Sequence, residues 1–242
     1  MKDNKKPASG SRIYRHEAKE REWQLPENGS KNLEVIENHL EKHVGKVETV
    51  YHEILSDLIH LDILIIPSNA NKPYHTLVTC GVSEMPMTVP QGVEDYKYAE
   101  LMINLPARWP LLKDYEVIGN NENDHWPIRW LKHIGRLPHD YDTWIGWGHT
   151  IPNGDPAVPI ANTKFTGVML TFPYWFGPDF FQLEIEPGEK INFYYMVPLY
   201  KEEMDLKLAK GAEIIDKRIA KDKNNFILNT KRKNVAKKKR WL

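Results

Sequence analysis

Cysteine is almost absent from this sequence, which has one, Cys80, among 242 residues. A single cysteine excludes a disulfide framework within the chain and any zinc site built from several cysteines. Long hydrophobic runs are also missing: residues 63–66, one of the longest, fall far short of the roughly 20 residues that a membrane-spanning helix needs. The first 23 residues lack the apolar core of a secretory signal. We therefore expect a soluble, cytoplasmic protein that does not act at a membrane.

The signature motifs of several common enzyme classes are missing as well. The sequence contains no GxGxxG, no GxxxxGK[ST], no HExxH and no GxSxG. These motifs position a dinucleotide, a nucleotide phosphate, a catalytic zinc ion and a hydrolase nucleophile, respectively. Their absence favours a protein that has no enzymatic activity and no cofactor.

Charge is balanced overall but unevenly distributed. Lys and Arg together number 33, and so do Asp and Glu. Residues 229–242 hold seven Lys and Arg and no acid, so residues 1–228 carry 26 basic against 33 acidic residues, a net charge of −7. A cluster of Lys and Arg favours phosphate binding, but no base-reading motif accompanies this one. We interpret residues 223–242 as a disordered basic tail and expect no nucleic-acid partner.

The hydrophobic pattern predicts a mixture of helices and strands. Leu33, Ile36 and Leu40 recur at spacings of three and four, as in a helix over residues 31–44 that ends before Gly45. Runs rich in β-branched residues, and runs that alternate with polar residues, predict strands. The strands expected are 60–67, 74–82, 98–106, 165–172, 180–186 and 190–197, and the other helices expected are 126–135 and 201–220. This order predicts a single α+β domain, with a mixed, mainly antiparallel sheet and flanking helices.

His60 and Asp62 are two residues apart on an expected strand, so their side chains point to one face of the sheet. A histidine and a carboxylate on one face usually share a hydrogen bond, and with a further ligand they hold a metal ion. We favour the hydrogen bond and expect no metal site, because no ligand motif completes the set. If Asp62 is buried, it must accept hydrogen bonds or pair with a cation.

Residues 172–181, FPYWFGPDFF, contain six aromatic residues in ten. Aromatic side chains at this density either build a core or, at the surface, anchor a binding partner. Tyr174, Trp175 and Phe176 precede a Gly-Pro pair, which indicates the tip of a loop. These three residues are our first candidates for partner binding, and core packing is the alternative.

An ordered set of motifs resembles the suppressor-of-fused-like (SUFU) domain family. Its four parts are a strand with an internal acid at Asp62, the L-V-T-x-G-x-S-x-x-P-M turn that ends at Met87, the A-E-L-x-x-x-L-P strand within residues 98–106, and the paired acids Glu202–Glu203. The resemblance spans roughly residues 30–210.

The resemblance implies a protein-binding module and not an enzyme. Eukaryotic members of the family hold a transcription factor by adding a partner strand, and bacterial members look like immunity proteins that neutralise a cognate polymorphic toxin. This chain has no room for the extra C-terminal domain of the eukaryotic regulator, which favours the bacterial branch. The segment 141–151 lies where the eukaryotic branch engages its peptide, so Trp144, Trp147 and His149 form a second group of candidate partner-binding residues.

These observations predict three units: a flexible lead-in over residues 1–29, the SUFU-like domain over 30–222 and the basic tail over 223–242. Our first functional hypothesis is an immunity protein, or antitoxin, that binds its toxin stoichiometrically. The net negative charge of residues 1–228 suits a toxin with a basic cleft, because opposite charges speed association. The second hypothesis is a regulatory scaffold that binds a transcription factor or peptide by strand addition. The third is a metal-dependent hydrolase centred on His60, Asp62 and His75.

Overall fold

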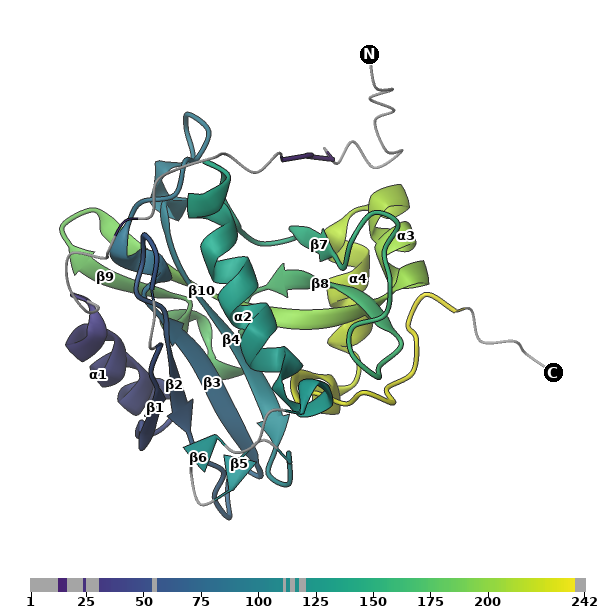
Figure 1. Ribbon diagram of the computed structural model, residues 1–242, viewed down its shortest axis with the longest axis horizontal. Coiled ribbons are helices and arrows are strands. Elements are labelled where there is room, and N and C mark those ends of the chain that lie inside the picture. The colour runs from purple at the N-terminus through teal and green to yellow at the C-terminus, as the bar shows by residue number, and fades with distance from the viewer. Residues whose placement is uncertain are drawn as a thin grey trace.

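One eight-stranded sheet runs through the protein (Figure 1). The computed structural model describes residues 13–16, 24, 31–53, 56–110, 112–113, 116–117 and 121–237. In spatial order the strands are β1 (Thr49–Tyr51), β2 (Asp62–Ile66), β3 (Tyr74–Cys80), β4 (Tyr98–Pro106), β10 (Glu189–Tyr200), β8 (Phe165–Thr171) and β7 (Thr150–Pro152). A further strand, β9 (Gln182–Glu186), forms a hairpin with β10, and β5 (Leu112–Lys113) pairs with β6 (Glu116–Val117) in a separate two-stranded sheet. The β4–β10 pairing is parallel, and the other described pairings are antiparallel.

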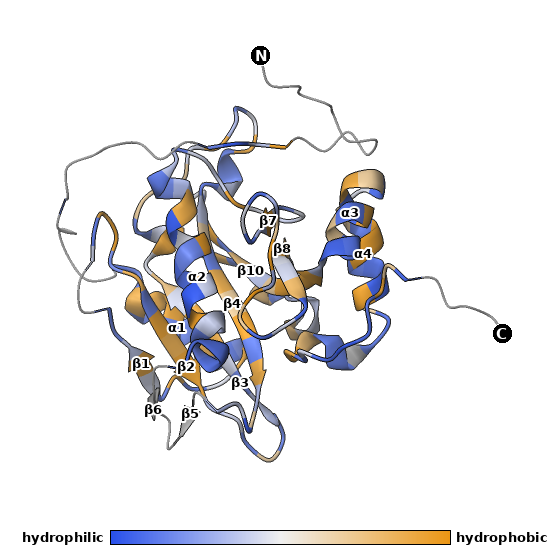
Figure 2. Cartoon of the chain, turned by 45° about the vertical axis from the view of Figure 1, so that its right-hand side comes forward, coloured by the Kyte–Doolittle hydropathy of each residue, from blue (hydrophilic) through white to orange (hydrophobic). Residues whose placement is uncertain are grey.

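Helices flank this sheet. They are α1 (Leu33–His43), α2 (Glu122–Asp140), α3 (Lys201–Lys210) and α4 (Ala212–Ile219). The long helix α2 crosses one face of the sheet, and α3 and α4 lie beyond β8 at the end that also holds β7 (Figure 1). Orange, hydrophobic strands lie behind a largely blue, hydrophilic outer surface of α2 (Figure 2). The predicted class, a single α+β domain with a mainly antiparallel sheet, is confirmed.

The central strands β2, β3 and β8 are buried along their whole length, and β4 is buried up to its last residue, Pro106. In β4 the alternation predicted from sequence puts Glu100 and Asn104 on the face opposite Leu101 and Ile103, yet both polar side chains are fully buried. Buried polar groups must be hydrogen-bonded. The partners of these two residues hold distant parts of the chain against the sheet.

The carboxylate of Glu100 is bound by four donors from the end of β3 and the turn that follows it. Its Oε2 accepts the hydroxyl of Thr79 at 2.5 Å, and its Oε1 accepts the backbone N–H groups of Gly81 and Ser83 at 3.0 Å and the Ser83 hydroxyl at 2.7 Å. Burial raises the pKa of Glu100 to about 7, and the hydrogen bonds act in the opposite direction. Gly81 has φ +133°, and a Cβ there would lie 1.9 Å from the carbonyl oxygen of His60. Only glycine fits this turn.

The basic segment after residue 222 is not a separate tail, at least as far as residue 237. Arg232 and Glu203 form an ion pair whose side chains are 6% and 0% exposed, with Nη2 at 2.5 Å from Oε2. Arg232 also donates to the carbonyl oxygen of Pro198 at 2.7 Å, and Leu228 donates its N–H to the carbonyl oxygen of Asn104 at 2.8 Å. Counting charges could not reveal this, because the buried partner of Arg232 lies 29 residues away.

The outer ends of the chain fall largely outside the described residues. Of the predicted lead-in over residues 1–29, the structure describes only 13–16 and 24. Residues 238–242 of the predicted basic tail also lie outside the described residues.

Two predicted helices have different boundaries in the structure. The helix predicted over 126–135 begins at Glu122, because the side chain of Asn121 caps it by accepting the N–H of Asn123 at 3.0 Å. The helix predicted over 201–220 is two helices, α3 and α4. They are separated by Gly211, whose φ of +91° ends the first.

We predict that Arg232→Met lowers the free energy of unfolding by about 3–5 kcal/mol, because it leaves Glu203 buried without its cation. The matched control is Arg129→Met, whose pair with Glu122 has side chains 55% and 50% exposed. Exposed pairs of this kind contribute at most about 1 kcal/mol. Urea unfolding followed by circular dichroism measures both values. Equal effects of the two substitutions would contradict a docked C-terminal segment.

Candidate partner-binding surface

Asp216, on α4, brings two of the sequence candidates together. Its Oδ2 accepts the indole N–H of Trp147 at 2.7 Å and the hydroxyl of Tyr174 at 3.4 Å. Its Oδ1 accepts the hydroxyl of Thr171, the last residue of β8, at 2.7 Å. Burial raises the pKa of Asp216, and these three donors oppose that rise. Trp147 and Tyr174, 27 positions apart in sequence, are thus held side by side.

The local sequence explains why the loop that carries Trp147 lies against α4. Gly148 has φ +78°, and a Cβ there would lie 2.9 Å from the Cβ of Ala212. Glycine therefore allows a close approach to the first turn of α4. Asp216 follows Ala212 by four residues, so it lies one turn further along the same helix face.

These side chains line a surface hollow of about 220 Å³. Tyr174 is 49% exposed, and Trp147 is half-buried. On α4, Glu213 and Lys217 form an exposed pair at 3.5 Å on the rim. The lining residues, which we call the Asp216 surface, are Trp147, Tyr174, Glu213, Asp216, Lys217 and Ala220.

Edge strand β7 follows Trp147 closely in the chain and lies at the same end of the molecule as α4 (Figure 1). It pairs with β8 on one side and, among the described residues, has no strand partner on the other. The Asp216 surface and a free sheet edge therefore lie at one end of the molecule.

Trp144 and His149 form a separate contact. Their rings meet edge to face with centroids 4.4 Å apart, and both are half-buried. Burial, aided by the nearby charge of Lys207, lowers the pKa of His149 to about 4, although a hydrogen bond with the backbone of Trp144 opposes the shift. His149 is therefore neutral at physiological pH.

Trp175 and Phe176 turn away from Tyr174, although the three residues are consecutive. Trp175 stacks on Phe226 with centroids 5.2 Å apart, and Phe176 packs against Phe180 at 5.1 Å. Both are half-buried. The loop tip predicted from sequence is a single 3-10 turn, which sends successive side chains in different directions.

Sequence reasoning missed Asp216, although a signal was present. The buried positions of α4 are Ala212 and Ile215, and Ile219 packs on the same core. An acid at position 216 therefore borders the apolar stripe instead of facing solvent. Such an acid requires hydrogen-bond donors, and Trp147 and Tyr174 are two of them.

The predicted set of His60, Asp62 and His75 is not assembled. His75 accepts the N–H of Ser68 at 3.2 Å and contacts the carbonyl oxygen of Ala107 at 3.1 Å. Asp62 pairs in register with Cys80, whereas His75 pairs with Leu105 toward the other end of β3.

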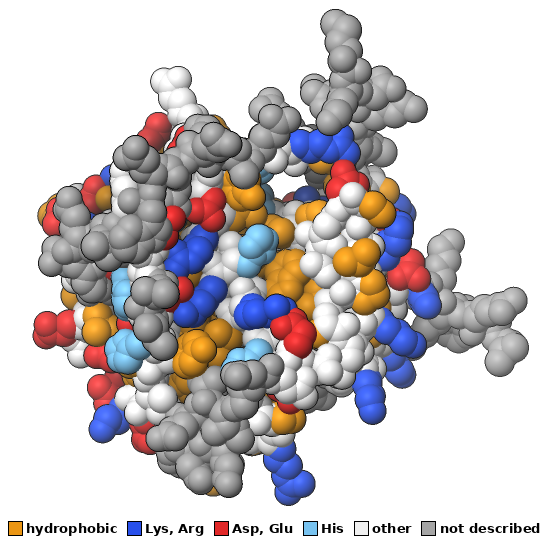
Figure 3. All heavy atoms as spheres, viewed as in Figure 1, with side chains coloured by type: hydrophobic (Ala, Val, Ile, Leu, Met, Phe, Trp, Pro, Cys, Tyr) orange, Lys and Arg blue, Asp and Glu red, His pale blue; other side chains and the backbone are white. Residues whose placement is uncertain are grey.

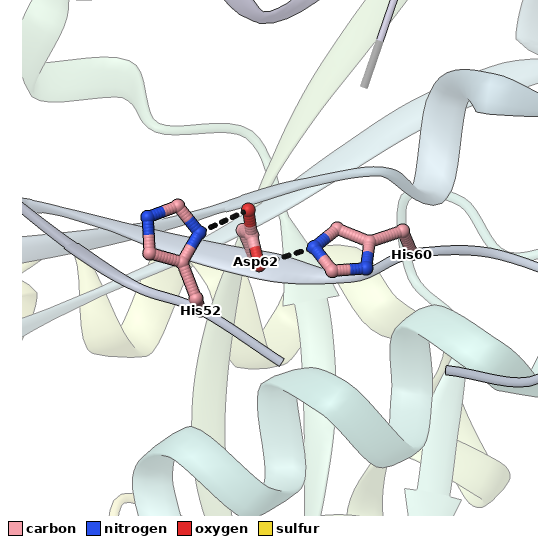
Figure 4. A group of neighbouring side chains, drawn as sticks. All are labelled: His52, His60 and Asp62. Carbon is pink, nitrogen blue, oxygen red and sulfur yellow. Dashed lines mark hydrogen bonds and ion pairs between the residues drawn. The ribbon is translucent and has the colours of Figure 1, made fainter. Parts of the chain in front are cut away.

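His52 instead lies beside Asp62, opposite His60 (Figure 4). The buried carboxylate of Asp62 accepts the N–H of Glu53 at 2.9 Å and lies 2.9 and 3.0 Å from the two imidazoles. The prediction that a buried Asp62 must accept hydrogen bonds is confirmed.

Comparison with known proteins places this fold. The profile of the suppressor of fused protein (SUFU) family matches residues 57–233. The chain belongs to the suppressor of fused protein family. The match includes the docked segment up to residue 233, which agrees with its burial in the structure. Among curated proteins, no sequence matches the chain.

Solved SUFU structures share the fold at low sequence identity. A protein from Neisseria gonorrhoeae described as a SUFU homolog superposes with a TM-score of 0.59 at 15% identity, covering 84% of this chain and 96% of that one. The structure of a Sufu–Fu complex gives a TM-score of 0.58 at 15% identity, with 86% and 93% covered. Drosophila Suppressor of Fused gives 0.58 at 12% identity, and the match covers 86% of this chain but 52% of the Drosophila protein.

One of these structures is thus that of a complex, Sufu with Fu. None of the helices within the described residues is both long enough and apolar enough to span a membrane.

We predict that protonation of His149 destabilises the fold. Its pKa of about 4 lies below the unfolded value of about 6.5, so the unfolded chain takes up a proton first as the pH falls. The stabilisation is complete above pH 6.5 and is lost between pH 6.5 and 4, by up to about 3 kcal/mol. Urea unfolding at several pH values should show a smaller loss for His149→Gln. If the free energy of unfolding falls equally with pH in the wild type and in His149→Gln, His149 is not the group responsible.

Proposed function

We propose that this SUFU-family chain is a non-catalytic protein-binding module that neutralises a cognate toxin by stoichiometric binding, as an immunity protein does. The observation that carries the proposal is the Asp216 surface, where two aromatic rings are held at a hollow on the molecular surface. Family membership supports protein binding as the activity. The absence of common catalytic motifs from the sequence is consistent with it.

The geometry of the Asp216 surface suits an anchor site. Interface energy usually resides in a few aromatic or arginine side chains. A flexible side chain loses rotamer freedom when it binds, which weakens the interaction. The hydrogen bonds to Asp216 fix the rings of Trp147 and Tyr174 before any partner arrives, so that loss is small.

Charge favours a basic partner at this surface. Asp216 and Glu213 face the hollow, against the single cation Lys217 among its lining residues. The face covered by α2 differs from this hollow, because Lys, Arg and His side chains gather there (Figure 3). A basic side chain of a toxin would therefore be attracted to the hollow itself, although α3 and α4 as a whole carry five Lys and Arg against five Asp and Glu. This attraction would act mainly on the association rate.

A second candidate function is strand addition, in which a peptide pairs with the free edge of β7. Edge strands offer unpaired backbone groups to a partner strand. However, β7 has three residues, and Pro152 has no N–H to donate. We rank this function second because such an edge provides few hydrogen bonds.

The test is co-expression with the protein encoded by the neighbouring gene. We expect a 1:1 complex in which the activity of that protein is lost. Trp147→Ala and Tyr174→Ala should each weaken binding about 30-fold, which corresponds to about 2 kcal/mol. Tyr174→Phe keeps the ring and is the matched control, with a much smaller loss. Raising the salt concentration should slow association more than it speeds dissociation.

Two outcomes would count against the proposal in different ways. If the complex forms but neither alanine variant weakens it, the partner is held elsewhere on the molecule. If the neighbouring protein neither binds nor loses activity, the immunity function is wrong, and an isolated peptide that protects the β7 edge would favour strand addition. Circular dichroism must show that each variant is folded.

A further inference from the structure

The histidines and the carboxylate beside β2 form a cluster that the protein-binding function does not use. The antiparallel register pairs Tyr51 with Ile63, so the next residue of the β1 chain, His52, lies opposite Asp62. His60 precedes Asp62 by two residues and lies on its other side (Figure 4). His52 Nδ1 is 3.0 Å from Asp62 Oδ2, and His60 Nε2 is 2.9 Å from Asp62 Oδ1. The three ligand atoms lie within 4.8 Å of one another.

The hydrogen-bond partner of His60 Nδ1 determines whether His60 Nε2 carries a hydrogen. Ser56 Oγ lies 2.8 Å from His60 Nδ1 and 3.0 Å from Glu53 Oε2. A hydroxyl has one hydrogen to donate, and we assign it to Glu53 because a hydrogen bond to a carboxylate is stronger than one to a neutral imidazole. His60 must then donate its Nδ1–H to Ser56.

This assignment has a consequence for Asp62. A neutral imidazole with hydrogen on Nδ1 has a lone pair on Nε2. That lone pair points at the oxygen of Asp62 from 2.9 Å, so two acceptors face each other. A positive charge must lie between them, either an added proton or a metal ion. The Ser56–Glu53 contact also resembles the outer hydrogen bonds that orient metal-binding histidines.

The protein's own cations do not fill this role. Lys132 and Arg136, on α2, contact Glu53, with Lys132 Nζ 3.5 Å from Oε1 and Arg136 bound to Oε2. Among the described residues, Asp62 forms no ion pair with either of them, and its charge acts on Lys132 only over a longer distance. Glu84 lies nearby: its Oε2 accepts the N–H of His60 at 3.4 Å, its buried Oε1 has no hydrogen-bond partner among the described residues, and burial raises its pKa to about 7. Within the part of the chain that the structure describes, Asp62 is therefore not neutralised by a Lys or Arg side chain in direct contact.

We propose that His52, His60 and Asp62 bind a divalent transition-metal ion of the zinc class. Two imidazole nitrogens and one carboxylate oxygen are a ligand set that suits Zn²⁺, whereas Mg²⁺ and Ca²⁺ prefer oxygen alone. Metal binding replaces the hydrogens between the imidazoles and Asp62, and small movements of the rings bring the three ligands to about 2.0–2.2 Å from the ion. His52, whose side chain is 69% exposed, has room for this movement.

The ion would fasten the end of β1 to the start of β2. β1 is an edge strand of three residues that pairs with β2 alone among the described strands. A ligand that binds only the folded state stabilises it in proportion to the logarithm of its concentration. We therefore expect zinc to raise the melting temperature. This inference does not rest on the proposed function, because the site lies on other strands than the Asp216 surface.

The test is titration of chelator-treated, full-length protein with ZnCl₂ in a calorimeter, with CoCl₂ as a spectroscopic probe. We expect one Zn²⁺ per chain, visible absorption bands for bound Co²⁺, a higher melting temperature with ZnCl₂, and no effect of MgCl₂. His52→Ala and His60→Ala should each bind Zn²⁺ at least tenfold more weakly. His133→Ala, which removes an exposed histidine of α2, is the matched control and should bind as the wild type does.

His52→Ala decides the outcome if His60→Ala fails to fold, because the exposed side chain of His52 contributes little to packing. Failure of the wild-type protein to bind Zn²⁺ would overturn the proposal. So would equal affinities of His52→Ala and His133→Ala, which would show that zinc binds to surface histidines in general.

Discussion

The buried carboxylate of Glu100 is the constraint on which most of the architecture depends. Its four donors fix the turn over residues 79–83, and two helices rest on that turn. Gly135 lets α2 approach it, since a Cβ there would lie 2.8 Å from a methyl group of Val82. Asn32, the N-cap residue of α1, donates to the carbonyl oxygen of Ser83 at 3.3 Å. Two of the four family motifs, the turn and the A-E-L strand, are thus the two halves of one hydrogen-bond network.

Sequence patterns predicted the elements well where local chemistry decides the structure. The strand over Tyr98–Pro106 was predicted from its alternation, and the α+β class from the order of the predicted elements. Patterns failed where a distant partner decides. Arg232 looked like part of a solvated charge run until its buried partner Glu203 was in view. The hydrolase hypothesis groups His75 with His60 and Asp62, but strand register, which the sequence does not reveal, brings His52 beside Asp62 instead.

At the Asp216 surface, too, the local sequence indicated some features, and distant contacts determine the others. Sequence composition indicated aromatic anchors but could not tell which consecutive ring faces outward, and the structure turns Tyr174 out and Trp175 inward. Asp216 connects Tyr174 to Trp147 because Gly148 allows the loop to meet α4. A larger hollow of about 360 Å³, around Trp109 and residues 224–230, has no charged residue in its lining. It offers less to a charged partner than the Asp216 surface does.

The most direct test of the account is backbone hydrogen exchange of the protein, alone and in complex with the product of the neighbouring gene. If the partner is held at the Asp216 surface, amide protection on binding should increase in residues 146–152 and 212–220. Exchange in α1 should remain unchanged. Protection confined to residues 106–109 and 224–230, around the larger hollow, would contradict the central claim that the α4 end of the sheet holds the partner.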